Sequence, residues 1–321
     1  MTKTRLTLVA ALSVTMLGAG GAVAATGQAT SDQSAGGLAP YAEAFTKTDR
    51  NTAWILTGRT RLDFETHHPQ GFALVGDKIF MSSVEIIERP VKYPAPVDGY
   101  DRTTGKGVGH LFVMTRDGRL LKDIVLSEDT MYHPGGIDYD GQDVWVPVGE
   151  YRPNSKSIVY RVDAETLDVQ EAFRYDDHVG GTVRDTESGR VHGVTWGSRR
   201  LVTWTPSGRR LDVTANPDHM LDYQDCSYSG DATQLCTGIT GLPTAAGGSY
   251  ELGGLALTSL ADDRVLHEVP FPRFSAAGHV VTRNPVALEQ DGGTLRMFAA
   301  PDDGDEVADT ELLVYEASIP R

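Results

Sequence analysis

The sequence predicts an all-β fold, namely a β-propeller of five blades that is closed by strands from both ends of the chain. The main observation is a unit of about 45 to 65 residues, built from two short strand hairpins, that recurs along the chain. A second observation is a strand pattern without a local partner at each end of this repeat. A third is that no helical period of useful length runs through the mature chain.

The first hairpin of each unit has a short apolar strand, a turn of Gly, Asp, Ser or Asn, and a strand of β-branched and aromatic residues. These hairpins occupy residues 68–83, 133–148, 178–197, 223–239 and 283–300. We expect each of them to form the two inner strands of one blade.

The second hairpin is a strand, a polar turn and another strand, found at residues 109–126, 157–175, 200–214 and 254–270. Residues 310–320 supply half of a fifth such hairpin, and residues 51–64 near the start of the domain supply its partner. This pairing of the two ends closes the ring. The count becomes six if the connection at residues 88–107 contains a further pair of strands. A two-sheet sandwich also has short strands, but it does not predict a unit repeated five times.

Residues 1–24 read as a signal peptide, because Lys3 and Arg5 precede an apolar run that ends in small residues. Glycines break the run and no stop-transfer charges follow it, which argues against a membrane anchor. Residues 25–50 read as a flexible leader, and residues 51–321 as a single propeller domain. We therefore predict a secreted, extracellular protein.

The formal net charge of −15 and the lack of a Lys/Arg cluster argue against nucleic acid or an anionic membrane as a partner. We expect a monomer whose partner is a small molecule or a saccharide.

The two cysteines, Cys226 and Cys236, lie ten residues apart around a turn-forming "SGDA". In an exported protein this arrangement favours a disulfide across a hairpin. A catalytic thiol or a metal pair is the weaker alternative, since tight thiolate sites usually show shorter spacings and more ligands.

The residues just ahead of each inner strand are expected to form the rim of the central channel. In chain order these rim residues are His68, His133, His178, Tyr223 and Arg283. Two places further on stand Gln70, Gly135, Gly180, Asp225 and Pro285. Glycine is expected at such places because strands crowd near the axis, and a residue without Cβ lets backbones approach each other.

Three imidazoles at equivalent places supply metal ligands or proton-transfer groups near neutral pH. We therefore predict His68, His133 and His178 as catalytic groups, as ligands of a divalent metal ion, or as both. The alternative is a polar plug that only binds water and neighbouring backbone.

The remaining rim residues suit substrate contacts. We expect Gln70 and Asp225 to orient the substrate or a metal, with Asp225 also a catalytic candidate. Arg283 would hold an anionic group, and Tyr223 and Asn284 would contact the substrate.

His192 is a further catalytic candidate on the second strand of the third unit, with Trp196 and Arg199 nearby as an apolar wall and an anion contact. His279 precedes the last inner strand and could equally be a loop residue.

Glu85 and Glu150 follow two corresponding strands and could face the same side of the ring. Such a pair could serve glycoside hydrolysis or hold a cation, or it could simply be solvated. The acidic stretch at residues 301–311 lacks the order of a calcium loop and reads as a solvated connection. His67, His219 and His267 read as peripheral.

The strings "HPQG" at residues 68–71 and "HPGGI" at residues 133–137 resemble segments that open inner strands in calcium-dependent propeller lactonases and strictosidine-synthase-like proteins. With the blade pattern, the resemblance covers about residues 53–320. It implies a central calcium held by an acidic residue and asparagines, and lactone hydrolysis. Here Gln70 and Gly135 stand at the matching places, and Asn284 and Asp225 are available as replacements.

The histidine-rich rim is similar in character to streptogramin lyases, a likeness that implies acid or base chemistry beside a divalent ion. Together the residues favour a secreted propeller enzyme that acts on a small molecule or saccharide by metal-assisted or histidine acid–base hydrolysis or elimination. The alternative is a secreted propeller that binds a ligand or a protein without catalysis.

Overall fold

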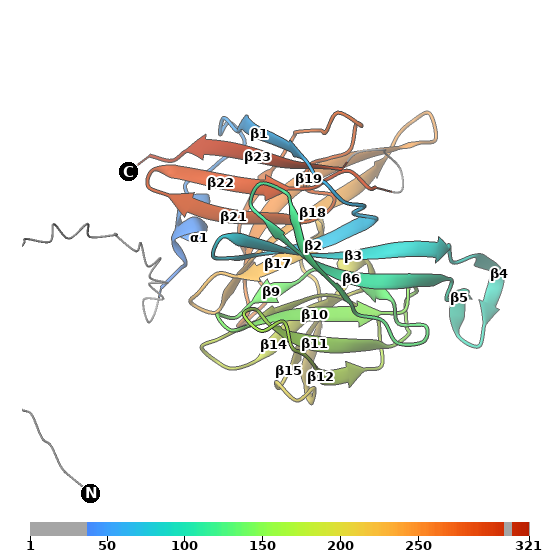
Figure 1. The fold of residues 1–321 in the computed structure, drawn as a ribbon. Helices are drawn as coiled ribbons and strands as arrows, with labels where there is room; N and C mark the ends of the chain where they lie inside the picture. Colours follow the sequence, from blue (N-terminus) through green and yellow to red (C-terminus); the bar gives the residue numbers. More distant parts are fainter. Residues whose placement is uncertain (1–36, 305–309, 321) are drawn as a thin grey trace, which may run out of the picture. The chain divides into compact units, whose positions relative to one another are not determined.

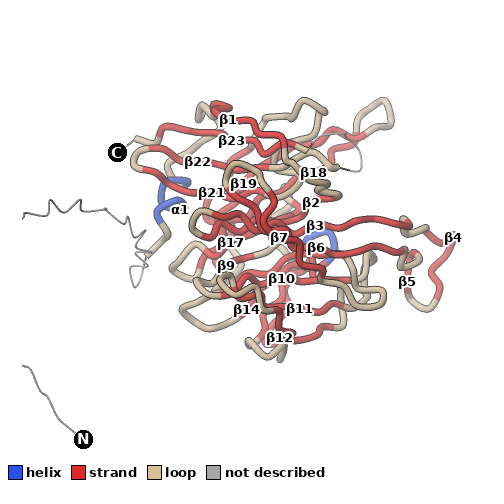
Figure 2. The backbone as a smooth tube through the Cα atoms, viewed as in Figure 1, coloured by secondary structure: helices blue, strands red, loops and turns tan. Residues whose placement is uncertain are grey.

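The computed structural model describes residues 37–304 and 310–320, which belong to one compact unit, Gln33–Arg321. Five antiparallel sheets arranged as the blades of a β-propeller make up this unit (Figure 1). Figure 2 shows strands joined by loops almost throughout, as the all-β prediction requires. The predicted signal peptide and residues 25–36 of the predicted leader lie outside the described residues.

The strands follow the predicted hairpins in order. Blade 1 contains β2 (His68–Val75), β3 (Lys78–Glu88), β6 (Lys106–Thr115) and β7 (Leu120–Val125). Blade 2 contains β8 (His133–Pro134), β9 (Asp138–Tyr139), β10 (Asp143–Gly149), β11 (Ser157–Asp163) and β12 (Val169–Tyr175). Blade 3 contains β13 (Val179–Arg184), β14 (Val191–Thr195), β15 (Arg200–Trp204) and β16 (Arg210–Ala215), with the one-turn 3-10 helix η1 (Trp196–Ser198) after β14.

Blade 4 contains β17 (Asp222–Tyr228), β18 (Thr233–Pro243), β19 (Ser249–Ser259) and β20 (Val265–Pro270). Blade 5 contains β21 (Val286–Asp291), β22 (Thr294–Ala299), β23 (Glu311–Ser318) and β1 (Ile55–Arg61). β1 pairs antiparallel with β23, with Arg59 opposite Leu313, so the predicted closure by strands from both ends is confirmed.

The core is divided among the gaps between neighbouring blades, because alternate side chains of each strand face opposite sides of its sheet. Five buried apolar clusters result, each drawn mainly from two adjacent blades. Between blades 2 and 3, for example, Trp145 and Phe173 pack with Trp204.

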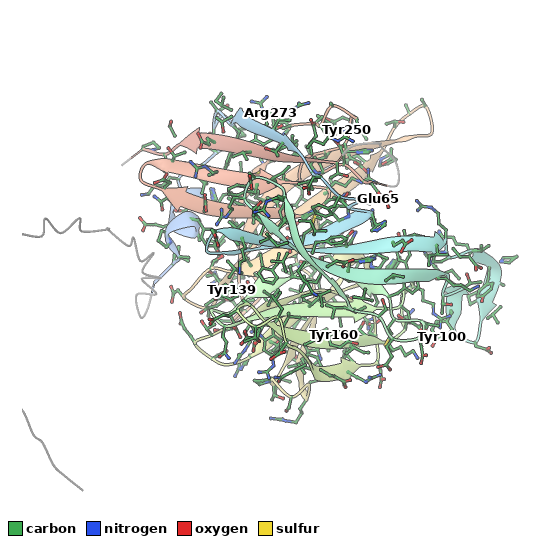
Figure 3. The ribbon with its side chains drawn as sticks, in the orientation of Figure 1. Glu65, Tyr100, Tyr139, Tyr160, Tyr250 and Arg273 are labelled. Atoms are coloured by element: carbon green, nitrogen blue, oxygen red, sulfur yellow. A yellow bond between two sulfur atoms is a disulfide. The ribbon has the colours of Figure 1, made fainter. Side chains whose placement is uncertain are left out.

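The connection at residues 88–107 contains strands but no sixth blade. It forms a two-stranded hairpin of β4 (Lys92–Val97) and β5 (Tyr100–Arg102), which continues outward from β3 and β6 of blade 1 (Figure 1). Tyr100 marks this hairpin in Figure 3.

The prediction of a flexible leader is wrong for residues 37–50, which include a packed helix. Helix α1 (Pro40–Phe45) packs against blade 5, and Ala42, Ala44 and Phe45 are buried in the cluster between blades 4 and 5. Six residues are too few to show a helical period, and tertiary packing rather than propensity stabilises such a helix. No described helix has the length and apolar character that a membrane crossing would require.

The inner strands carry a β-bulge at the channel. The register shifts between Pro69 and Gly71 in β2, between Val179 and Gly181 in β13, and between Tyr223 and Asp225 in β17. The extra, unpaired residues are Gln70, Gly180 and Gln224. Gln224, and not Asp225, is thus the blade 4 equivalent of Gln70.

Asp225 instead lies inside the channel and connects blades. Its carboxylate accepts hydrogen bonds from the backbone N–H of Phe72 in blade 1, at 2.7 Å, and of Ile137 in blade 2, at 3.1 Å. A Cβ at Gly71 or Gly136 would come within 3.1 Å or 2.9 Å of its Oδ1 atom, so those glycines leave the space that the carboxylate fills.

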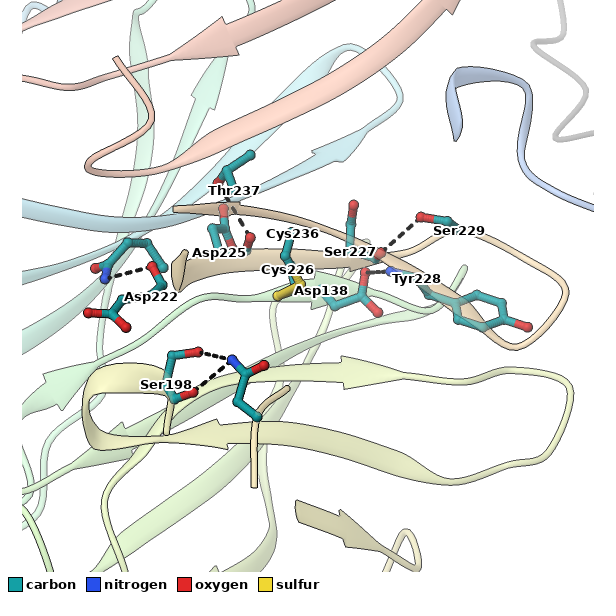
Figure 4. Close-up of a disulfide and its surroundings, with 12 residues drawn as sticks. Asp138, Ser198, Asp222, Asp225, Cys226, Ser227, Tyr228, Ser229, Cys236 and Thr237 are labelled. Atoms are coloured by element: carbon teal, nitrogen blue, oxygen red, sulfur yellow. Dashed lines mark hydrogen bonds between the residues drawn. A yellow bond between two sulfur atoms is a disulfide. The ribbon is translucent and has the colours of Figure 1, made fainter. Parts of the chain in front are cut away.

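Asp138 of blade 2 does the same for the next two blades. It accepts hydrogen bonds from the backbone N–H of Arg184 in blade 3, at 2.9 Å, and of Tyr228 in blade 4, at 3.2 Å. Figure 4 shows both aspartates beside the disulfide.

The predicted disulfide between Cys226 and Cys236 is confirmed. The two residues are direct partners in the register of β17 and β18 (Figure 4), so the bond joins neighbouring strands of blade 4.

Candidate functional site

A cavity of about 330 Å³ lies at the mouth of the channel, lined by residues from the starts of the inner strands of all five blades. The predicted site residues that line it are His68, Gln70, His133, His178, Trp196, Tyr223, Arg283 and Asn284. The bulged residues Gly180 and Gln224 line it as well. Residues of the predicted rim therefore lie around one cavity.

The hydrogen bonds of His68 and His178 determine which ring nitrogen carries the proton. His68 Nδ1 is bonded to the carboxylate of Asp303, and His178 Nδ1 lies 2.8 Å from the carbonyl oxygen of Glu150. Because a carboxylate and a carbonyl only accept hydrogen bonds, each Nδ1 is the donor. In the neutral form of each ring, Nε2 is then the acceptor.

His133 lies between these two imidazoles, with ring centroids 6.3 Å from His68 and 5.8 Å from His178. It is buried, stacks on Tyr151 at 4.1 Å, and neither of its ring nitrogens has a hydrogen-bond partner among the described residues. Burial, followed by the neighbouring His178 and His68, lowers the pKa of His133 well below its usual value. At neutral pH it is a neutral imidazole with one N–H donor and one acceptor.

Aromatic rings and guanidinium groups form one side of the site. Trp196 packs edge-on against His178 at 4.9 Å, and the Arg102 guanidinium of the β4–β5 hairpin lies 4.9 Å from the Trp196 ring centre. Burial raises the pKa of Tyr151, and the charges of Arg89, Arg102 and, more weakly, Arg283 oppose that rise. Arg102 is itself paired with the carboxylate of Asp101, at 2.8 and 2.9 Å, so the site combines aromatic surface with charges of both signs.

Three predicted residues do not line the cavity. Asp225 is committed to backbone amides inside the channel. His192 is buried between strands, where Thr203 Oγ1 lies 3.2 Å from its Nδ1 and burial lowers its pKa to about 4. Arg199 bonds to Asp222 and to the carbonyls of neighbouring loop residues. The structure assigns these three side chains to supporting contacts.

Two residues of the site were missed from the sequence. Asp303 lies in the acidic stretch read as a solvated connection, yet Asp302 and Asp303 are 4% and 2% exposed. That reading is corrected for these two residues, since Asp303 binds His68 and Asp302 accepts from Ser275 and His279. The other missed residue is Tyr151, which follows the last residue of β10 by two places.

The predicted carboxylate pair is not formed. Glu150 is buried and bonds to Thr130 and Arg152, whereas Glu85 lies on β3 beside His110. The two carboxylates belong to different surroundings and do not face a common substrate.

The residues at the channel do not fit a central calcium ion held by an acid and asparagines. Gln70 and Gly135 supply no carboxylate, and both oxygens of Asp225 accept backbone hydrogen bonds. Asn284 donates its side-chain amide to the carbonyl of Pro301 at 3.3 Å. Calcium requires several oxygen ligands, and these residues do not supply them.

A different group has the donors for a metal ion. Among the described residues, His67, Glu85 and His110 each offer one donor atom, and these atoms all lie within 4.8 Å of one another. His68, His133 and His178 do not form such a group, and their role as metal ligands stays a prediction. His67, read from the sequence as peripheral, is thus part of a candidate metal site.

The fold and this site define a five-bladed β-propeller with a histidine-lined channel mouth. The chain belongs to DUF6454, described as a family of unknown function, whose model matches residues 41–320. A comparison with curated proteins found no match.

Solved structures give distant likenesses. A luciferin-regenerating enzyme aligns with 10% identity and a TM-score of 0.43, covering 81% of this chain and 95% of that one. A gluconolactonase from Xanthomonas campestris aligns with 10% identity and a TM-score of 0.46, covering 86% and 92%. The tail fiber of Staphylococcus aureus phage P68 aligns with 8% identity and a TM-score of 0.45, covering 84% and 53%. At these values the likenesses carry no argument about activity.

Proposed function

We propose that the protein is an exported enzyme that hydrolyses a small anionic molecule at the channel mouth by imidazole acid–base catalysis. The observation that carries this proposal is the set of three neighbouring imidazoles, two with their acceptor nitrogen determined and one with both nitrogens unpartnered. Unsatisfied buried polar atoms are uncommon in folded proteins, and at a pocket they favour a ligand.

His68 is the proposed general base, because Asp303 orients its ring and stabilises the imidazolium that forms. Nε2 of His68 takes a proton from water, and the water oxygen bonds to the carbonyl carbon of an ester or lactone. The N–H of His133 donates to the developing oxyanion, as a neutral imidazole can. The carbon–oxygen bond to the leaving alkoxide then breaks, and His68 returns the proton to that oxygen.

The walls of the cavity favour a flat or ring-shaped substrate that carries a negative charge. Tyr151 and Trp196 offer aromatic surface, and the guanidinium group of Arg283 suits a carboxylate or phosphate. A volume of about 330 Å³ is at the small end of ligand pockets, as a small molecule or short saccharide requires.

Export is part of the proposal. The disulfide between Cys226 and Cys236 is of the kind that persists in oxidising compartments. Residues 1–24, an apolar segment that follows two basic residues, are the expected targeting signal.

The test is a turnover screen of the mature chain on carboxylated esters, lactones and uronic saccharides. We expect turnover to fall by at least 100-fold in His68→Gln and in His133→Gln, and to be unchanged in His219→Gln, which replaces an exposed histidine. Asp303→Asn should lower kcat more than it changes KM. Turnover that survives both His68→Gln and His133→Gln would overturn the assignment.

A second candidate function is ligand binding without catalysis, favoured by the aromatic rings of Tyr151 and Trp196 in the cavity wall, since aromatic surface suits the apolar face of a sugar ring. It predicts saturable binding of a uronic saccharide, measured by calorimetry, that Tyr151→Ala abolishes while no bond in the ligand is cleaved.

A further inference from the structure

We propose that His67, Glu85 and His110 bind one divalent transition-metal ion of the zinc type, at a site separate from the channel-mouth cavity. The three residues come from different places on blade 1: His67 directly precedes β2, Glu85 lies on β3 and His110 on β6. None of them lines the cavity that contains His68 and His133.

Strand register brings the donors together. In the β3–β6 pair Ser83 lies opposite His110, and Glu85 lies opposite Val108, so Glu85 and His110 are diagonal neighbours on one face. The Nε2 atom of His110 is 3.9 Å from Oε2 of Glu85.

His67 completes the group from the adjoining segment. Its ring stacks on that of His110, with centroids 5.1 Å apart. Its backbone has φ of 54°, and its carbonyl accepts a hydrogen bond from Gly304 N at 2.6 Å. His67 thus lies beside His110, whereas His68 lines the channel-mouth cavity.

The hydrogen bonding and burial of His110 are a second, independent observation that favours a bound metal ion. Asp123 of β7 accepts a hydrogen bond from Nδ1 of His110 at 2.9 Å, which in the neutral ring places the lone pair on Nε2. His110 is 7% exposed, and its Nε2 has no hydrogen-bond partner among the described residues. A carboxylate behind a histidine, with the far nitrogen free to bind, is the usual support of a metal-ligating imidazole.

The donor chemistry selects the kind of ion. Two imidazoles and one carboxylate suit zinc and neighbouring first-row ions, whereas calcium and magnesium prefer sets of oxygen ligands. The Glu85 side chain is 43% exposed, so it has the freedom to adjust to an ion. Three protein ligands leave a position open for water.

The test is calorimetric titration of the mature, tag-free, chelator-stripped protein with Zn²⁺, Co²⁺, Ca²⁺ and Mg²⁺. We expect one Zn²⁺ per chain, Co²⁺ binding with a visible absorption spectrum, and at least 100-fold weaker binding of Ca²⁺ and Mg²⁺. Absence of saturable Zn²⁺ binding at micromolar concentrations, or equal affinity for Ca²⁺, would overturn the proposal.

Variants locate the ion. His110→Gln and Glu85→Gln should each weaken Zn²⁺ binding by at least 10-fold, and the half-exposed position of Glu85 makes that variant safe for folding. Asp123→Asn should weaken it 10- to 100-fold while the Co²⁺ spectrum keeps its ligand set, as expected of a positioning residue. His219→Gln and His133→Gln should bind Zn²⁺ as the unaltered chain does. Loss of binding in His133→Gln with retention in His110→Gln would place the ion at the channel instead and refute the proposed site.

Discussion

The carboxylate of Asp225 accepts a hydrogen bond from the backbone N–H of Phe72 at 2.7 Å, although the two residues are 153 positions apart in the chain. The same carboxylate binds Ile137 N, so a single side chain of blade 4 joins blades 1 and 2 at the channel. The contact therefore connects blade 4 to two blades that are not its neighbours around the ring.

Replacing Asp225 with Asn should lower the free energy of unfolding by about 2 to 3 kcal/mol, because an amide has one acceptor oxygen where a carboxyl has two and leaves a buried N–H unpaired. Urea unfolding measures this, with Asp176→Asn on the exposed surface as control. A variant that unfolds within about 0.5 kcal/mol of the unaltered protein would show that Asp225 does not connect the blades in solution.

Replacing Phe45 with Ala should cost about 3 to 5 kcal/mol, since this ring of α1 is fully buried between blades 4 and 5. Thermal and urea unfolding of Phe45→Ala measure the loss, and Lys47→Ala on the exposed side is the control. A chain that starts at residue 51 should be destabilised to a similar degree or more. If that shortened chain were as stable as the unaltered protein, residues 37–50 would be a flexible leader after all.

The stability of the ring should fall between pH 4 and pH 7 through Asp138. Burial raises the pKa of this carboxyl to about 7, above its unfolded value near 4. Its stabilising contribution is therefore fully present below about pH 4 and is lost as the pH rises through 7, by up to about 1.4 kcal/mol per pH unit. We expect the difference in unfolding free energy between the unaltered protein and Asp138→Asn to shrink over this range. A difference that grows with pH would contradict the assignment.

His192 should act in the opposite direction. Burial lowers its pKa to about 4, below its unfolded value near 6.5, so its contribution is complete above about pH 6.5 and is lost as the pH falls toward 4. Unfolding curves of His192→Gln at several pH values should show less acid destabilisation than the unaltered protein, with the exposed His219→Gln unchanged. Equal acid sensitivity in His192→Gln would count against a buried neutral imidazole.

Removing the disulfide by changing Cys226 and Cys236 to Ser should cost about 2 to 3 kcal/mol, because the bond closes a loop of 10 residues in the unfolded chain. Unfolding in the presence of a reductant should lower the stability of the unaltered protein by a similar amount and leave the double variant unaffected. A double variant that responds to the reductant would point to another sensitive group.

Most of the fold could be predicted because a propeller repeats one local pattern. The turn residues and strand periods of residues 68–83 recur in each unit, and the unpaired strand at each end requires a partner. Helix α1 escaped prediction because six residues carry no period, and the buried surface that stabilises it belongs to blades far along the chain.

The site could be predicted in place but not in detail. The alignment of repeats brought His68, His133 and His178 to one rim, as the structure shows. It misplaced Asp225 by one position, because the bulge at Gln224 changes which side chain faces the cavity and a one-residue slip reverses the faces of a strand.

The sequence by itself determined the repeat, the closure of the ring, the disulfide and the rim on which the histidines lie, because all of these follow from local patterns. Only the tertiary structure decided the partners of those side chains: Asp303 behind His68, Tyr151 against His133, and His67 beside Glu85 and His110. These contacts depend on strand register and on which blades are neighbours around the ring, and such relationships leave no signal in the spacing of residues along the chain.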